Sequence, residues 1–136
     1  MSGLKLKANE MDTNSVSSED QQKINAFARL HTRHEELKAD TKRKTNELQN
    51  VSEAADEILL LDDEHSSAIP FRVGDTFVCY DSDALGDKLE TLKARLEQEI
   101  SEIQTRQTDI QTEMAKLKVD LYGKFGNSIN LEADDD

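Results

Sequence analysis

The chain has 136 residues with a formal net charge of −12, and 34% of its residues are charged whereas only 4% are aromatic. Phosphate backbones and anionic membrane surfaces repel such a chain, so neither a nucleic acid nor a membrane is expected as its partner. It has no apolar run long enough for a transmembrane helix, no apolar segment near its N-terminus for a secretory signal, and a single cysteine. These features favour a cytoplasmic protein built from long helices.

The first expected element is a long helix over residues 17–61, which follows a polar and aperiodic N-terminal arm, residues 1–16, that we expect to be disordered. Ser18 and Gln21 have the spacing of a capping box at the start of this helix. Apolar side chains then recur at alternating intervals of three and four, which predicts a coiled-coil seam. The seam positions are Phe27, Leu30, His34, Leu37, Thr41, Lys44, Leu48, Val51, Ala55 and Ile58. The polar members in the middle of this seam weaken it but can fix its register.

Residues 67–80 form the only segment that is typical of β-structure, and Gly74 and Asp75 near its middle predict a hairpin with a two-residue loop. An isolated two-stranded hairpin is marginal in water and leaves two edges unpaired, so we expect other chains to cover it. The residues expected to carry this assembly are Ile69, Phe71, Val73, Thr76, Phe77, Val78 and Tyr80. Cys79, on the same ribbon, is expected to be a packed small side chain.

A second helix is expected over residues 82–123, and its seam runs through Leu85, Leu89, Leu92, Leu96, Ile100, Ile103, Gln107, Ile110, Met114, Leu117 and Leu121. An acidic tail, residues 132–136, closes the chain. The predicted fold class is therefore mainly α: a long antiparallel two-helix coiled coil with a single β-hairpin at its bend. The whole unit would span residues 17–131.

Apolar residues are also in excess at the two helix ends that lie far from the hairpin in sequence. Two paired helices need only one apolar stripe each, and Ile24, Val119, Tyr122 and Phe125 lie off that stripe. Two interpretations stay open: these side chains form an exposed binding surface, or Phe125 and Ile129 fold back and cap the seam. The candidate binding residues are Ile24, Phe27, Leu117, Leu121, Tyr122 and Phe125.

No pattern in the sequence predicts catalysis, a metal site or a cofactor. The chain lacks a glycine-rich phosphate loop and a nucleophile elbow. His31 and His34 are three residues apart on one helix, but they lack the third and fourth ligands that zinc requires. The acidic run 62–64, followed by His65, does not have the spacing of an EF-hand loop and is expected to be a solvated connector.

Four stretches together resemble the prefoldin family, and the single hairpin resembles its β-type subunits. They are EDQQKINAFARL (19–30), AADEILLLDDE (54–64), IPFRVGDTF (69–77) and LYGKFGNSINLEAD (121–134). The resemblance implies a heterohexamer in which this chain joins two α-type and three further β-type subunits through their hairpins. It also implies that the coiled-coil tips hold unfolded actin and tubulin and pass them to the cytosolic chaperonin without ATP hydrolysis. The protein would be non-enzymatic and cytoplasmic, with the nucleus as a second location left open.

Carried over by position, the hairpin Ile69–Tyr80 becomes the assembly element and the six candidate binding residues become the client-binding tip. An alternative that the sequence leaves open is an acidic coiled-coil tether or adaptor subunit of a structural complex. The tether would explain the helices but not the β-ribbon at the bend.

Overall fold

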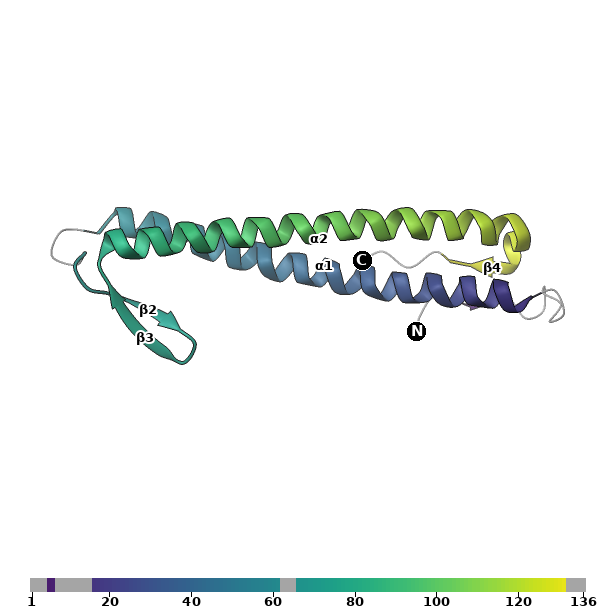
Figure 1. Cartoon of the computed structure of the whole chain (residues 1–136), viewed down its shortest axis with the longest axis horizontal. Coiled ribbons are helices and arrows are strands. Elements are labelled where there is room, and N and C mark those ends of the chain that lie inside the picture. The colour runs from purple at the N-terminus through teal and green to yellow at the C-terminus, as the bar shows by residue number, and fades with distance from the viewer. Residues whose placement is uncertain (1–4, 7–15, 62–65, 132–136) are drawn as a thin grey trace. The chain divides into compact units, whose positions relative to one another are not determined.

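The computed structural model describes residues 5–6, 16–61 and 66–131, and it contains two long helices with an antiparallel hairpin between them in sequence (Figure 1). This confirms the predicted fold class. The main elements are α1 (Ser18–Leu59), β2 (Ile69–Val73), β3 (Thr76–Tyr80) and α2 (Ser82–Phe125). Two short strands, β1 (Lys5–Leu6) and β4 (Ile129–Asn130), and the 3₁₀ turn η2 (Gly126–Ser128) complete the described chain. Within these residues, neither long helix has a stretch apolar enough to cross a bilayer.

A capping box starts α1, one residue earlier than the sequence pattern suggested. The Ser17 hydroxyl accepts a hydrogen bond from the Asp20 backbone N–H at 3.1 Å, and the Asp20 carboxylate accepts one from the Ser17 N–H at 3.3 Å. A carboxylate accepts more strongly than the amide of Gln21, which explains why this pair prevails over Ser18 and Gln21. The helix ends at Leu59, against the 61 expected.

The start and the end of α2 have similarly local causes. The Asp81 carboxylate accepts a hydrogen bond from the Ala84 N–H at 2.7 Å, which caps the first turn. The helix runs to Phe125, two residues beyond the predicted end. It stops where Gly126 takes a left-handed conformation, with φ of +57°, as glycines after helices commonly do.

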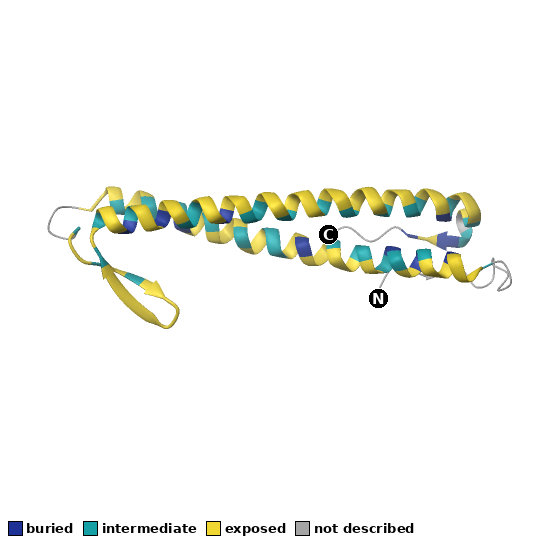
Figure 2. Cartoon of the chain, viewed as in Figure 1, coloured by how far each residue is buried: buried dark blue, intermediate teal, exposed yellow. Residues whose placement is uncertain are grey.

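The predicted seam is confirmed along both helices, because every seam position is buried or half-buried while most intervening positions are exposed (Figure 2). The contacts divide the chain into two units. The tip unit comprises residues 1–38 and 105–136, and the hairpin unit comprises residues 39–104. Each unit has its own apolar core.

The hairpin has the predicted register, with Ile69 opposite Tyr80 and Val73 opposite Thr76. Gly74 has a positive φ of +62°, and Asp75 beside it does not have a positive φ. This pattern matches a two-residue turn with glycine in the first position. The pairs next to such a loop exchange backbone hydrogen bonds and alternate pairs do not. Pro70 therefore falls on a pair that exchanges none, and its missing N–H lies on the outer edge of β2.

Two residues of the N-terminal arm, which we expected to be disordered, form a strand. Lys5 and Leu6 make up β1, which pairs antiparallel with β4 in the register Lys5 to Asn130 and Leu6 to Ile129. A two-residue strand is specified by its partner and has no sequence pattern of its own, so the periodicity of the arm could not predict it. Most of the arm, the acidic connector 62–65 and the acidic tail 132–136 lie outside the described residues.

Candidate functional site

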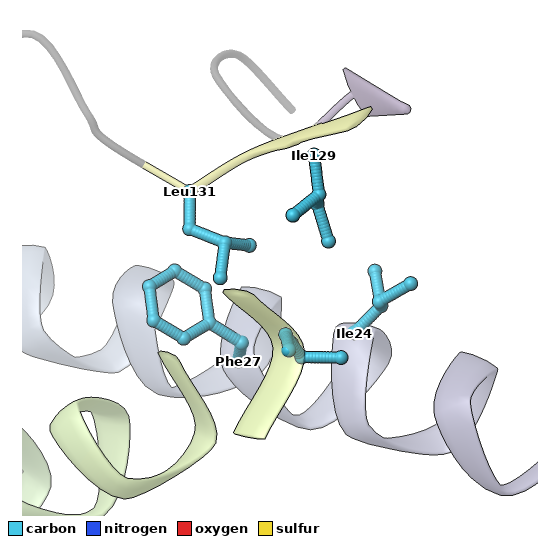
Figure 3. Close-up of a cluster of buried hydrophobic side chains, with 5 residues drawn as sticks. Ile24, Phe27, Ile129 and Leu131 are labelled. Carbon is cyan, nitrogen blue, oxygen red and sulfur yellow. The ribbon is translucent and has the colours of Figure 1, made fainter. Parts of the chain in front are cut away.

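An apolar cluster in the tip unit joins both helix ends to the C-terminal segment. Ile24 and Phe27 come from α1, Leu121 comes from α2, and Ile129 and Leu131 lie across them (Figure 3). Four half-buried side chains pack around this cluster: Met114, Leu117, Tyr122 and Phe125. The structure thus brings together all six residues of the predicted binding tip.

Three of the six candidate binding residues are not accessible at the surface of the chain. Ile24, Phe27 and Leu121 are buried, with only 3% of Phe27 and 1% of Leu121 exposed. Phe27 and Leu121 are seam residues, and Ile129 folds back over the helix ends beside them, which was the capping alternative left open by the sequence. A role in client binding is therefore a prediction that requires these side chains to be uncovered.

Leu131 is an apolar residue that the sequence also places at the tip, outside the six candidate binding residues, and it is a buried member of the cluster. A signal for its burial was present, because Ile129 and Leu131 alternate with polar residues after the helix-ending Gly126, as in a strand with one buried face. The pattern is only three residues long, which is too short to separate a strand from an irregular tail. Its burial depends on the surface formed by α1 and α2.

Charged side chains frame the cluster where α1 begins and α2 ends. The Lys124 ammonium contacts the buried Asp20 carboxylate, and Lys23 lies 3.7 Å from Asp120. The hydrogen bond from Lys124 is the main cause that lowers the pKa of Asp20, and bonds from Ser17 act in the same direction, while burial opposes them. These pairs tie the two helix ends together within the tip unit.

A groove of about 330 Å³ runs beside the cluster in the tip unit, and its lining includes Phe27, Met114 and Leu131 together with His31 and His34. The His34 Nε2 atom lies 3.2 Å from the Gln111 side-chain nitrogen, so this polar seam residue has a partner on the facing helix. Among the described residues, no three His, Cys, Asp or Glu side chains come close enough together to hold a metal ion.

In the hairpin unit, a polar seam position also has a partner across the helix pair. The Lys44 ammonium donates to the Glu99 carboxylate at 2.6 Å, and both side chains are about one-third exposed. This hydrogen bond is the main cause that lowers the pKa of Glu99. A charged pair at one seam position favours one register of the helices over its neighbours.

One face of the hairpin packs on the helices of its own unit. Ile69, Phe71 and Tyr80 contact a core formed by Val51, Leu85, Leu89 and Leu96. The rings of Phe71 and Tyr80 meet edge to face at 6.2 Å, and the Lys88 ammonium lies within 6 Å of both ring centres. These three predicted assembly residues therefore already support the chain's own core.

The rest of the predicted assembly surface is exposed. Phe77 is 68% exposed, and Val73, Thr76 and Val78 are exposed as well. Cys79 shares the outward face with Phe77 and is exposed, so the expectation that it is packed was wrong. That face points away from the helices that cover Phe71, so none of the described residues of its unit buries the thiol.

Sequence reasoning missed a second exposed apolar group at the end of α1. Leu59 and Leu60 are 83% and 85% exposed, and Leu61 is also exposed. The three leucines follow the last seam residue, Ile58, and lie outside the heptad positions. Leucines at positions outside the heptad seam could have indicated, from the sequence alone, that this surface needs a further partner.

The comparisons with known proteins agree on one family. The model of the family described as "Prefoldin subunit" matches residues 21–128. Prefoldin subunit 4 of Homo sapiens is 44% identical over 135 residues, covering 99% of each chain. A probable prefoldin subunit 4 of Caenorhabditis briggsae is 45% identical over 120 residues, covering 88% of this chain and 95% of the relative.

A solved structure extends the agreement to the fold. The prefoldin beta subunit from Thermococcus strain KS-1 has a TM-score of 0.69 with this chain and 15% sequence identity. The match covers 82% of this chain and 96% of that one. The family model, the relatives that are similar over nearly the full length, and the shared fold all agree. The chain therefore belongs to the prefoldin family, whose subunits are non-enzymatic co-chaperones.

Proposed function

We propose that the chain is a β-type subunit of a heterohexamer that holds unfolded polypeptides and passes them to the cytosolic chaperonin without ATP hydrolysis. Its partners in the hexamer are two α-type and three further β-type subunits, its clients include unfolded actin and tubulin, and its location is the cytoplasm, with the nucleus as a second site. The relatives named prefoldin subunit 4 support this assignment.

The exposed hairpin supports the assembly part of the proposal. Phe77 and the β3 edge lack a partner within the described chain, and an unpaired strand edge readily takes a strand from another chain. Pro70 removes one donor from the β2 edge, so the β3 edge has the fuller set of free backbone groups. Leu59 and Leu60, in the same unit, add apolar area for a partner to cover.

The apolar cluster of the tip unit supports the client-binding part. It gathers more apolar side chains than two paired helices need, and this excess is the single observation that carries the proposal. An unfolded chain exposes many apolar segments. Several subunits that each bind one such segment weakly can together bind the whole chain tightly. The net charge of −12 keeps a subunit with such a surface soluble.

Two variants with opposite expected effects test this division of labour. Phe77→Asp places a charge on the exposed hairpin face and should abolish incorporation into the hexamer, because a partner would have to bury it. Leu117→Ser combined with Phe125→Ser reduces the half-buried apolar area at the tip. It should leave assembly intact and weaken suppression of aggregation of denatured actin severalfold.

Ala94→Asp serves as the control for both variants, since Ala94 is exposed in α2 and belongs to neither surface. It should leave hexamer incorporation and client capture unchanged. Size-exclusion chromatography with the other subunits measures the first property, and light scattering of diluted, denatured actin measures the second. Loss of assembly from the tip variant, or an assembled wild type that captures no actin, would refute the proposed function.

A further inference from the structure

We propose that the surface beneath Ile129–Leu131 is a binding site for extended, unfolded polypeptide, and that these three residues occupy it in the resting chain as an internal substitute for the client. The inference rests on the proposed function and specifies how the site recognises its ligand. The ligand is a stretch of extended backbone with two aliphatic side chains two residues apart.

The buried side chains of the segment show what the surface accepts. Ile129 and Leu131 are 4% and 3% exposed, and Asn130 between them is exposed. The backbone at Ile129 is extended, with φ of −129° and ψ of 143°, so side chains two residues apart point to the same side. Figure 3 shows both side chains directed at Phe27 and Ile24. The surface thus already holds a short extended peptide.

Two polar contacts of the segment use its main chain. The Leu131 N–H donates to the Tyr122 hydroxyl at 3.0 Å, and β4 pairs with β1 through backbone groups. Every polypeptide presents the same N–H and C=O groups whatever its sequence. Recognition by main-chain bonds and by two aliphatic contacts therefore suits a site that must accept many unfolded chains.

The way the segment is attached allows it to be replaced. It follows the end of α2 after the left-handed Gly126 and the short turn η2, so its release requires no change in either long helix. Its release would expose Ile24, Phe27 and Leu121, the buried members of the predicted tip. While the segment occupies the site, clients cannot bind there. The apparent affinity for clients therefore equals the affinity of the open site multiplied by the fraction of time for which the site is open. Clients that offer many apolar segments at once would overcome this competition.

Weakening the segment should therefore strengthen client capture. In the full chain assembled with its partner subunits, Ile129→Ser combined with Leu131→Ser should lower the concentration for half-maximal capture of denatured actin about tenfold or more. Tyr122→Phe keeps the ring but removes the hydroxyl that accepts a hydrogen bond from the Leu131 N–H. It should lower the concentration for half-maximal capture too, but by a smaller factor. Asn130→Gln, which keeps an amide at the exposed position between the two aliphatic residues, is the matched control and should change nothing.

A labelled peptide of residues 126–131 tests the site without any client. It should bind the Ile129→Ser/Leu131→Ser assembly, measured by fluorescence anisotropy, and displace actin from it. The same peptide with serine at both aliphatic positions should do neither. Peptide binding in an assembly that captures no actin would support the site while refuting the proposed function.

Two results would overturn the inference itself. One is a double variant with wild-type helicity by circular dichroism whose capture of actin is unchanged or weaker. The other is the absence of peptide binding to the Tyr122→Phe assembly and to the double variant alike. Either result would make the segment a permanent cap of the helix ends.

Discussion

Asp20 links the start of α1 to the end of α2, although it is an acidic side chain with only 5% exposure. Its carboxylate accepts from the Ser17 N–H and contacts the Lys124 ammonium. The sequence predicted a capping box at the start of this helix but placed it at Ser18 and Gln21. The carboxylate at Asp20 is the stronger acceptor, and it gains a second partner in Lys124, which lies about a hundred residues away and reaches Asp20 only in the folded chain.

We expect Asp20→Asn to lower the melting temperature of the chain by a few degrees near neutral pH, and much less in acid. The folded pKa of Asp20 is lowered, so its stabilisation is fully present above the unfolded pKa of about 4. It is lost as the pH falls through the lower, folded pKa. Thermal unfolding followed by circular dichroism between pH 7 and pH 2 measures the difference between wild type and variant.

Glu19→Gln is the matched control, because Glu19 is the neighbouring acid in the same first turn and is exposed. It removes the interaction of one acid with the helix dipole but leaves the bond to Lys124. The control should lower the melting temperature less than Asp20→Asn at neutral pH. Equal effects of the two variants would mean that Lys124 contributes nothing beyond the general charge of this turn.

The elements differ in how far the sequence determines them. The heptad spacing predicted which side of each long helix is buried, because a 3.5-residue period leaves one continuous apolar stripe. The period of two and the Gly74–Asp75 loop predicted the register of β2 and β3. Strands β1 and β4 could not be predicted, because two residues carry no measurable period. Their pairing is a property of the folded tip unit.

Two glycine substitutions test these element assignments with opposite expected signs. Gly86 lies inside α2, where an added Cβ would meet no atom within 4 Å. Gly86→Ala should therefore raise the free energy of unfolding by about 0.5–1 kcal/mol. Gly74 has equally open surroundings but a φ of +62°, so Gly74→Ala should lower the free energy by roughly 1–2 kcal/mol.

Urea denaturation followed by circular dichroism measures both changes. The two sites offer the same space to a methyl group, so any difference between them reflects the backbone conformation alone. A neutral or stabilising Gly74→Ala would contradict the left-handed turn of the hairpin. A destabilising Gly86→Ala would contradict an uninterrupted helix at that position.

At the scale of the whole molecule, the exposed apolar surface is unevenly divided between the two units. In the described chain, the large exposed apolar side chains of the hairpin unit are Leu59, Leu60, Leu61, Val73, Phe77 and Val78, whereas the tip unit contributes Val119. The sequence located both apolar regions but left open whether the tip is exposed or capped by its own chain. Composition identifies an excess of apolar residues, but the segment that covers it is found only once the chain has folded.

This uneven division has a direct consequence for the state of the protein in the cell. The tip unit covers its apolar cluster with its own C-terminal segment, and the hairpin unit leaves Phe77 and the β3 edge for another chain. A chain left in this condition would associate through its open edge with whatever strand it met. We therefore expect the hairpin unit to be occupied by partner subunits whenever the protein is stable.

Native mass spectrometry of the chain purified from cells tests this claim most directly. We predict an assembly of six chains that contains one copy of this subunit with two α-type and three further β-type subunits, and no appreciable free monomer. A pair of chains alone would favour the tether that the sequence left open. A well-folded monomer with its hairpin strands protected from hydrogen exchange would contradict the account.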